Sequence, residues 1–457
     1  YRGTNHFLLE FIKSLSKLEA LKISVSGIRG IFGKDLTLNH ILKFTNNFST
    51  LIKLKKCVIA MDTRPSGHII VETVKAKLME SGIDVYDLGI APTPVVFRES
   101  RKYGAGLVIT SSHNPIEWNG LKMIIDGKGI NDEQLDTITN KQITNKSKIG
   151  TEYNIKSDYI NDAIKVIGKI SGRPKVTVDI GGGAAKMILP ELLKKIGCDI
   201  KIVNDDFNKS SRGPDPTTDP LEDLVLNTKG RDIGFAFDLD ADRLVIVMDG
   251  VKKNPDVTLG LGVVKALELG YKNFVLSQDT SISIEKYIKQ KNGIVFHSKV
   301  GEANVSKKMI ETKSQAGGEG SSGGFILSDF NHCRDGILTS GLIISIIRKN
   351  TFHDMMNFME KYHLIRDKIE CELEYHDELL ENLHTKMKEK YSDLQTIDGI
   401  KAIIDEDSWV LVRKSNTENI IRLSVESNNT EKVRDIHQQN KELIKQCYEQ
   451  IKRKKDN

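Results

Sequence analysis

Two short polar segments, far apart in the sequence, carry side chains that together suit phosphoryl transfer. The first is Thr110–Pro115, with the sequence TSSHNP, and the second is Asp238–Arg243, with the sequence DLDADR. A serine that carries a phosphoryl group needs a divalent cation to neutralise the phosphoryl oxygens, and alternating carboxylates on a short turn can hold such a cation. The two segments therefore predict phosphoryl transfer through a phosphoserine.

Three aspartates alternate along a turn after a predicted buried strand: Asp238, Asp240 and Asp242. Carboxylates packed this closely raise one another's pKa, a conflict that a bound divalent cation removes. A calcium EF-hand is disfavoured, because Arg243 and Asp249 stand where that loop needs glycine and glutamate. Few protein ligands plus a phosphate oxygen suit Mg²⁺. We expect one Mg²⁺ per chain, held by the aspartates and an oxygen of the phosphoserine, with Arg243 able to bind phosphate oxygens.

Ser112 follows a predicted buried strand that ends at Val108 and Ile109. Loops at this end of a strand are where α/β sheets commonly bind ligands. A serine before His-Asn-Pro also caps turns, so the hexapeptide alone favours a structural role, and only the other motifs reverse that preference.

Four further motifs join these two, and together they resemble the α-D-phosphohexomutases, the family of phosphoglucomutases, phosphomannomutases and phosphoglucosamine mutases. The further motifs are Ser26–Gly30, Asn119–Lys122, Gly318–Gly324 and Arg413–Glu418. The resemblance runs from about Ile23 to about Ser427, and the six motifs stand in the family's order.

The resemblance implies a role for each motif. Ser112 becomes the phosphorylated residue, with His113, Lys122 and Arg29 as catalytic groups beside its phosphate. A lysine offers a mobile charge to transferring oxygens, and a histidine can shuttle a proton. Taken alone, each of these three side chains also fits an ordinary structural or surface position.

The resemblance also implies a set of residues that bind the sugar phosphate. They are Arg243, Lys299, Glu319, Ser321, Ser322, Arg413, Ser415, Asn416, Thr417 and Arg422. Glu319 and a serine are expected to bind sugar hydroxyls, and the residues from Arg413 to Arg422 to cradle the phosphate that is not reacting. His297, close to Lys299, is a weaker candidate.

The chain departs from the family's pattern at a few positions. Leu239 stands where a glycine is usual, and we expect this to change the turn only slightly. Lys414 and Asn419 replace prolines, which should loosen the loop between Arg413 and Arg422 without removing its donors. One residue is added in the glycine-rich loop, which leaves open whether Ser321 or Ser322 contacts the sugar.

Three segments repeat an apolar strand, a turn, a helix and another apolar strand, beginning at Cys57, Val176 and Asn273. Each is a right-handed β-α-β candidate, so we predict three similar α/β domains with mixed sheets. From about Arg366, long helical segments, two short strands and a charged helix from Thr430 predict a smaller α+β domain. The resemblance places the active site in the central cleft. The expected divisions are an N-terminal extension (1–21) and phosphoserine (22–167), metal-binding (168–270), sugar-binding (271–366) and distal-phosphate-binding (367–457) domains.

The composition is that of an ordinary globular protein, with 457 residues and a net charge of +5. Its five scattered cysteines fit a reducing compartment, and no apolar run reaches the ~20 residues of a membrane span. We therefore expect a cytoplasmic protein without nucleic acid or membrane partners. The resemblance implies an enzyme that acts on a small-molecule sugar phosphate, as a monomer or homodimer.

The predicted reaction moves a phosphoryl group between C1 and C6 of a hexose, with hexose 1,6-bisphosphate as the activator. The run Ile116–Asn119 resembles that of bacterial relatives that act on glucosamine phosphate, which favours this substrate, while mannose and glucose phosphates remain close alternatives. A phosphatase that works through a phosphoserine is a second hypothesis, and a non-catalytic sugar-phosphate-binding protein is a third.

Overall fold

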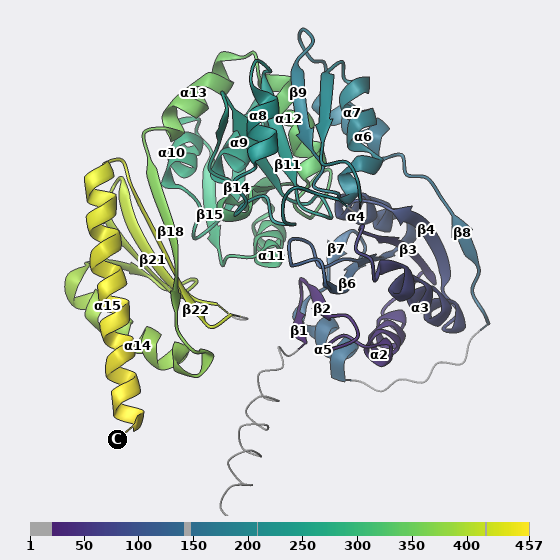
Figure 1. The fold of residues 1–457 in the computed structure, drawn as a ribbon, viewed down its shortest axis with the longest axis horizontal. Helices are drawn as coiled ribbons and strands as arrows, with labels where there is room; N and C mark the ends of the chain where they lie inside the picture. The colour runs from purple at the N-terminus through teal and green to yellow at the C-terminus, as the bar shows by residue number, and fades with distance from the viewer. Residues whose placement is uncertain (1–20, 141–147, 208, 416–417, 457) are drawn as a thin grey trace, which may run out of the picture.

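The computed structural model describes residues 21–140, 148–207, 209–415 and 418–456. The expected N-terminal extension, apart from its last residue, and the candidates Asn416 and Thr417 lie outside the described residues. Four sheets follow one another along the chain (Figure 1). Three are mixed sheets with helices and the fourth is antiparallel, which confirms the predicted architecture.

The first sheet has the strand order β1-β2-β6-β5-β3-β4-β8, with β7 paired to β6. Its strands are β1 Lys22–Ser24, β2 Gly27–Ile31, β3 Lys56–Met61, β4 Asp84–Ile90, β5 Ala105–Ile109, β6 Trp118–Ile125, β7 Lys128–Gly129 and β8 Glu152–Asn154. Its helices are α2 Leu38–Ser49, α3 Gly67–Glu80, α4 Thr93–Tyr103 and α5 Asp132–Asn140. β3 pairs in parallel with β4 and β5, and β5 pairs antiparallel with β6.

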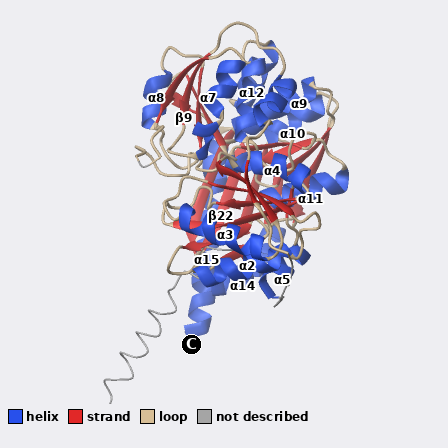
Figure 2. Cartoon of the chain, turned by 90° about the vertical axis from the view of Figure 1, so that its right-hand side faces the viewer, coloured by secondary structure: helices blue, strands red, loops and turns tan. Residues whose placement is uncertain are grey.

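The second sheet has the order β10-β9-β11-β12-β13. Its strands are β9 Lys175–Asp179, β10 Asp199–Val203, β11 Ile233–Phe237, β12 Leu244–Met248 and β13 Val251–Lys252. Its helical segments are α6 Tyr159–Ile167, η1 Ala184–Met187, α7 Leu189–Lys195 and α8 Glu222–Thr228. All five residues of β11 are buried, as expected for an apolar strand covered on both faces. Figure 2 shows α7 and α8 beside β9 in this part of the molecule.

The third sheet has the order β15-β14-β16-β17. Its strands are β14 Asn273–Ser277, β15 Ile294–Ser298, β16 Ala316–Glu319 and β17 Gly324–Leu327. The associated helical segments are α9 Asp256–Glu268, α10 Ile282–Gln290, α11 Glu302–Thr312, η2 Gly320–Ser322, α12 Gly336–Ile346 and α13 Asn350–Met359. α12 is apolar on all sides and every one of its residues is buried, because it packs on α6 as well as on α9. One hydrophobic core therefore joins the second and third sheets.

The fourth sheet is antiparallel throughout, in the order β18-β22-β21-β20-β19. Its strands are β18 His363–Glu370, β19 Asp393–Gln395, β20 Ile400–Asp405, β21 Ser408–Lys414 and β22 Ile420–Ser427. Its helical segments are η3 Leu373–Tyr375, α14 His376–Lys390 and α15 Thr430–Asp456. The prediction of helix from about Arg366 was wrong at its start, because β18 is a half-exposed edge strand that pairs along its whole length with β22.

The expected domain boundaries at 167, 270 and 366 stay predictions. α9 lies before the second boundary and packs on β16 and β17 of the third sheet. None of the helices in the described part of the chain is both long and apolar enough to cross a membrane.

The third and fourth sheets meet through buried polar groups. Glu426 on β22 accepts hydrogen bonds from the backbone N–H of Ile282 (2.7 Å), from Trp409 Nε1 (2.7 Å) and from the hydroxyl of Ser281. Lys401 Nζ donates to the carbonyl of Gln278 at 2.7 Å. Burial raises the pKa of Glu426 to about 7 and lowers the pKa of Lys401 to about 8. Burial therefore disfavours the charged form of both side chains.

We predict that Glu426 makes the protein less stable as the pH rises. Its pKa is about 7 in the folded protein and near 4.5 when unperturbed, so the stabilisation from its proton is complete below pH 4.5 and lost by about pH 7. Between pH 5.5 and 8 this loss is about 2 kcal/mol. Glu426→Gln should flatten the fall in melting temperature by the corresponding amount, measured by calorimetry, while Glu381→Gln, at an exposed position of α14, should not. Equal pH slopes in wild type and Glu426→Gln would contradict this.

Candidate active site

Ser112 lies in the loop between β5 and β6 and is almost fully buried. Its φ is 51°, in the left-handed region that residues other than glycine seldom adopt. Its backbone N–H donates to Thr110 Oγ1 at 2.8 Å, and its hydroxyl donates to Asp238 Oδ2 at 2.7 Å. The predicted nucleophile and the predicted metal loop are thus in direct contact.

Arg64, which the sequence reasoning missed, fixes the backbone of the loop between β5 and β6. Its guanidinium donates to four backbone carbonyls, those of Ser112 (2.6 Å), Asn114 (2.7 Å), Pro115 and Trp118 (2.9 Å). Asp62 at the end of β3 fixes Arg64 through Nε at 3.1 Å and accepts from Thr110 Oγ1 at 2.6 Å. An Asp-x-Arg pair directly after a buried parallel strand was the signal available in the sequence.

The segment Asp238–Arg243, called the aspartate loop below, connects β11 to β12. Its left-handed residue is Ala241, with φ 58°, so Leu239 fits where a glycine was expected. The backbone of Leu239 instead needs Gly183, where an added Cβ would lie 2.9 Å from Leu239 Cα. Ala184 N–H donates to the carbonyl of Leu239 at 2.8 Å, which fixes the loop on the second sheet.

The three aspartates offer ligand atoms that all lie within 4.8 Å of one another, and all three residues are buried. Burial and the charges of its two neighbours raise the pKa of Asp238 well above its ordinary value. Asp240 Oδ2 accepts from Thr93 Oγ1 at 2.6 Å, whereas its buried Oδ1 has no hydrogen-bond partner among the described residues. An orphaned carboxylate oxygen beside two further carboxylates fits a divalent cation.

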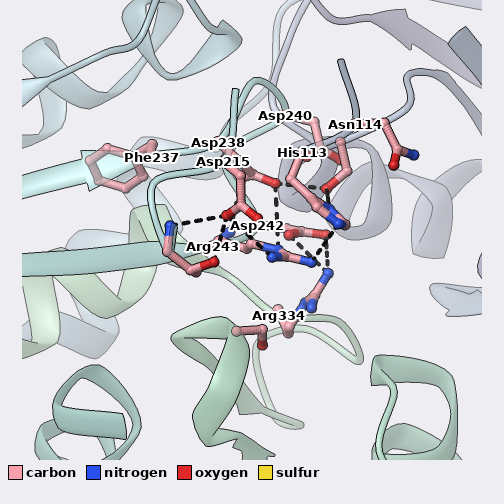
Figure 3. A network of polar contacts seen from close by, with 12 residues as sticks. His113, Asn114, Asp215, Phe237, Asp238, Asp240, Asp242, Arg243 and Arg334 are labelled. Atoms are coloured by element: carbon pink, nitrogen blue, oxygen red, sulfur yellow. Dashed lines mark hydrogen bonds and ion pairs between the residues drawn. The ribbon is translucent and has the colours of Figure 1, made fainter. Parts of the chain in front are cut away.

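His113 contacts both Ser112 and Arg243, and Figure 3 shows its ring close to Arg243. Its Nε2 is 3.3 Å from Arg243 Nη2, and its Nδ1 is 3.3 Å from Ser112 Oγ. Burial and the nearby arginines lower the pKa of His113 well below its ordinary value, so the ring is neutral. A guanidinium only donates, so Nε2 is the acceptor and the ring proton sits on Nδ1, facing Ser112.

Lys122 and Arg29 lie on adjacent strands beside the aspartates. Lys122 Nζ is 3.1 Å from Asp242 and 3.3 Å from Glu302, and these carboxylates raise the pKa of Lys122 despite its burial. Arg29 pairs with Gly120 across β2 and β6, where an added Cβ would come within 2.9 Å of Arg29 Cγ. Burial lowers the pKa of Arg29, while Asp240 and Asp242 oppose that shift.

The glycine-rich loop runs from β16 through η2 to β17. Glu319 is buried, and it accepts from Gly301 N–H at 3.1 Å and from Arg334 Nη1 at 3.2 Å. Ser322 is buried and donates to the carbonyl of Glu319 at 3.2 Å, while the more exposed Ser321 bonds to Asp279. Their roles toward the sugar therefore stay open.

The two candidates near β15 differ in their surroundings. Lys299 follows the strand and is exposed. His297 lies on β15, and its Nε2 pairs with Glu285 of α10 at 3.2 Å, so its ring has a partner without any substrate.

The distal-phosphate candidates lie at the β21–β22 hairpin. Arg413 and Arg422 are direct cross-strand partners, and burial together with Arg413 lowers the pKa of Arg422. Arg422 also pairs with Glu418, and Ser415 Oγ accepts from the N–H of Glu418 at 3.1 Å. Two neighbouring guanidinium groups repel each other, and a bound anion would relieve that repulsion.

Four consecutive stretches of the chain match the phosphoglucomutase/phosphomannomutase family. They are alpha/beta/alpha domain I over residues 20–149, domain II over 157–251, domain III over 254–362 and the C-terminal domain over 373–443. The chain belongs to this family. It is therefore a phosphohexomutase, an isomerase, as the motifs predicted.

Similar curated proteins are found in archaea. A probable phosphoglucosamine mutase of Methanosphaera stadtmanae is 34% identical over 95% of this chain and 99% of its own length, and one of Methanothermobacter thermautotrophicus is 32% identical over 90% and 95%. A phosphoglucomutase/phosphomannomutase of Thermococcus kodakarensis is also 32% identical, over 90% of this chain and 95% of its own.

Solved structures share the fold. A phosphoglucomutase/phosphomannomutase family protein of Burkholderia thailandensis has a TM-score of 0.80 at 25% identity and covers 93% of this chain and 98% of its own. N-acetylphosphoglucosamine mutase of Aspergillus fumigatus, solved with GlcNAc-6P and magnesium, has a TM-score of 0.57 at 14% identity, with 94% and 96% covered.

We predict that Arg64→Lys lowers the isomerase rate about 100-fold, because a lysine cannot serve four carbonyls at once and the Ser112 loop shifts. Mg²⁺ binding, measured by calorimetry, should stay within threefold of wild type. Arg98→Lys, which changes a half-buried arginine that contacts Asp162 and the carbonyl of Phe330, is the control. A rate for folded Arg64→Lys within threefold of wild type would show that this residue does not position Ser112.

Proposed function

We propose that this phosphohexomutase is a phosphoglucosamine mutase, which interconverts glucosamine 6-phosphate and glucosamine 1-phosphate. The observation that carries the chemistry is the hydroxyl of Ser112, 2.7 Å from Asp238 in a cluster of three carboxylates. The names of the archaeal relatives favour the glucosamine substrate. Mannose and glucose phosphates stay as alternatives, because the Thermococcus kodakarensis relative is named a phosphoglucomutase/phosphomannomutase.

Ser112 is the residue that carries the phosphoryl group between turnovers. When the free hydroxyl of the bound sugar attacks, a bond forms between the sugar oxygen and phosphorus while the bond from phosphorus to Ser112 Oγ breaks. The proton of the attacking hydroxyl ends on Ser112 Oγ. The Nδ1–H of neutral His113 points at that oxygen and stabilises the charge that develops on it.

Asp238, Asp240 and Asp242, together with an oxygen of phosphorylated Ser112, form the ligand set for one Mg²⁺. The orphaned Oδ1 of Asp240 and the raised pKa of Asp238 both support a cation at this place. When bound, the ion neutralises negative charge on the phosphoryl oxygens. Lys122, Arg29 and Arg243 supply further positive charge around the same group, and Lys122 stays protonated.

The sugar binds at the glycine-rich loop, and its second phosphate binds at the β21–β22 hairpin. Glu319 accepts hydrogen bonds from sugar hydroxyls, Ser321 or Ser322 adds a hydroxyl that can donate or accept, and Lys299 borders this place. The unreacting phosphate binds the set Arg413, Ser415, Asn416, Thr417 and Arg422. The repulsion between the two arginines supports this assignment.

The intermediate is a hexose 1,6-bisphosphate, which also serves as the activator that first phosphorylates Ser112. It has to reorient by about half a turn, so that its other phosphate faces Ser112 and the same distal set serves both orientations. Cytoplasmic location and a monomeric or homodimeric state stay predictions.

Phosphorus NMR tests this function. Purified protein with Mg²⁺, a trace of hexose 1,6-bisphosphate and glucosamine 6-phosphate should produce glucosamine 1-phosphate, faster than the corresponding reactions of mannose and glucose phosphates. Ser112→Ala should abolish the reaction, whereas the matched variant Ser111→Ala should retain it within about tenfold of wild type. Release of inorganic phosphate without an isomer, or full activity of Ser112→Ala, would contradict the proposal.

A further inference from the structure

Arg334, in the loop before α12, contacts three carboxylates from three different segments of the chain. Its Nη2 lies 2.9 and 3.0 Å from the two oxygens of Asp242, its Nη1 lies 3.2 Å from Glu319, and its Nε lies 3.1 Å from Glu302. The residue is buried, and Figure 3 shows it reaching toward Asp242. No other residue in the described part of the chain is recorded in ion pairs with three different carboxylates at the site.

These three carboxylates belong to separate parts of the proposed machinery. Asp242 is in the aspartate loop, Glu319 is in the glycine-rich loop, and Glu302 at the start of α11 pairs with Lys122. A guanidinium presents its donors in a rigid fork, so each nitrogen of Arg334 is committed to a different carboxylate. A change at one of these contacts is therefore felt at the other two.

We propose that Arg334 couples the sugar pocket to the metal site, because one positive charge is shared between Glu319 and Asp242. This inference rests on the proposed function, in which the aspartates hold a divalent cation and Glu319 holds the sugar. When Glu319 forms hydrogen bonds with sugar hydroxyls, its ion pair with Arg334 weakens and the ion pair between Arg334 and Asp242 strengthens. The positive charge of Arg334 then competes with the metal for Asp242. Sugar and metal then weaken each other's binding, reciprocally.

Such antagonism suits the reaction. The bisphosphate intermediate has to leave the aspartate loop before it can reorient, and a metal held less tightly while the sugar is bound eases that release. Once the sugar departs, Glu319 recovers Arg334 and the metal is held firmly again.

Simple electrostatics also lowers cation affinity when a nearby negative charge is removed, so a single variant does not isolate the contribution of Arg334. A double-mutant cycle separates the two effects. Arg334→Lys keeps the charge but places it on one compact ammonium, which cannot bridge three carboxylates. Glu319→Gln keeps the shape and removes the charge.

Calorimetric titration of the full-length chain with Mg²⁺ alone, without substrate, is the measurement. Glu319→Gln should weaken Mg²⁺ binding about fivefold with Arg334 present, and less than twofold in the Arg334→Lys background. The control is Asp215→Asn, which removes a charge beside Arg243 that does not contact Arg334. Its effect should be the same in both backgrounds.

Equal effects of Glu319→Gln in both backgrounds would overturn the coupling. If Arg334→Lys does not fold, Arg334→Gln takes its place, and a change below 1.5-fold for Glu319→Gln alone overturns the proposal by itself. The two hypotheses fail separately. Isomer formation without coupling refutes only the role of Arg334, whereas coupling of Mg²⁺ binding without isomer formation from any hexose phosphate refutes the proposed function.

Discussion

The concentration of buried negative charge beside one serine is the constraint on which the site depends. Ligand atoms of three aspartates lie within 4.8 Å of one another, and Glu302 and Glu319 form ion pairs with Arg334, which also pairs with Asp242. Buried carboxylates are costly unless cations or donors compensate them. Lys122 and Arg334 outweigh burial at Asp242 and hold its pKa below the ordinary value, while Asp240 keeps an oxygen without a hydrogen-bond partner in the described chain. This charge distribution leaves room for one further cation.

The fold brings these charges together by repeating one arrangement. In the first three sheets a strand pairs in parallel with two neighbours, and the second of these pairs antiparallel with the next strand, as in β4-β3-β5-β6, β10-β9-β11-β12 and β15-β14-β16-β17. Ser112, the aspartate loop and Glu319 all lie at the connection between the last two strands of a unit. The distal arginines flank the β21–β22 hairpin of the fourth sheet. Ligand-binding loops at equivalent sheet edges thus meet at one place.

Much of this was predictable from the sequence, because the decisive residues are clustered. The β-α-β units followed from apolar runs and turns, and Ser112 and the aspartates followed from short motifs whose chemistry is mutually dependent. The strand β18 was missed because a half-exposed edge strand alternates weakly and depends on its partner β22.

Arg64 and Arg334 were missed for a different reason. Each acts through contacts with residues distant in the sequence, such as the 92 positions between Arg334 and Asp242. Arg334 gives no local sign that carboxylates will surround it, whereas Arg64 had one local signal, the Asp-x-Arg pair that it forms with Asp62 directly after β3. The expectation that Leu239 changes the turn only slightly agrees with the left-handed conformation falling on Ala241.

The central claim is that the phosphate on Ser112 and a divalent cation on the aspartates lie side by side. The phosphorus resonance of the phosphorylated protein tests this when Mg²⁺ is replaced by paramagnetic Mn²⁺, which favours the same oxygen ligands. We predict a sharp phosphoserine signal with Mg²⁺, its loss by broadening with one equivalent of Mn²⁺, and its retention in Asp240→Asn at the same Mn²⁺ concentration. A phosphoserine signal that stays sharp while wild-type protein binds Mn²⁺ would contradict the account.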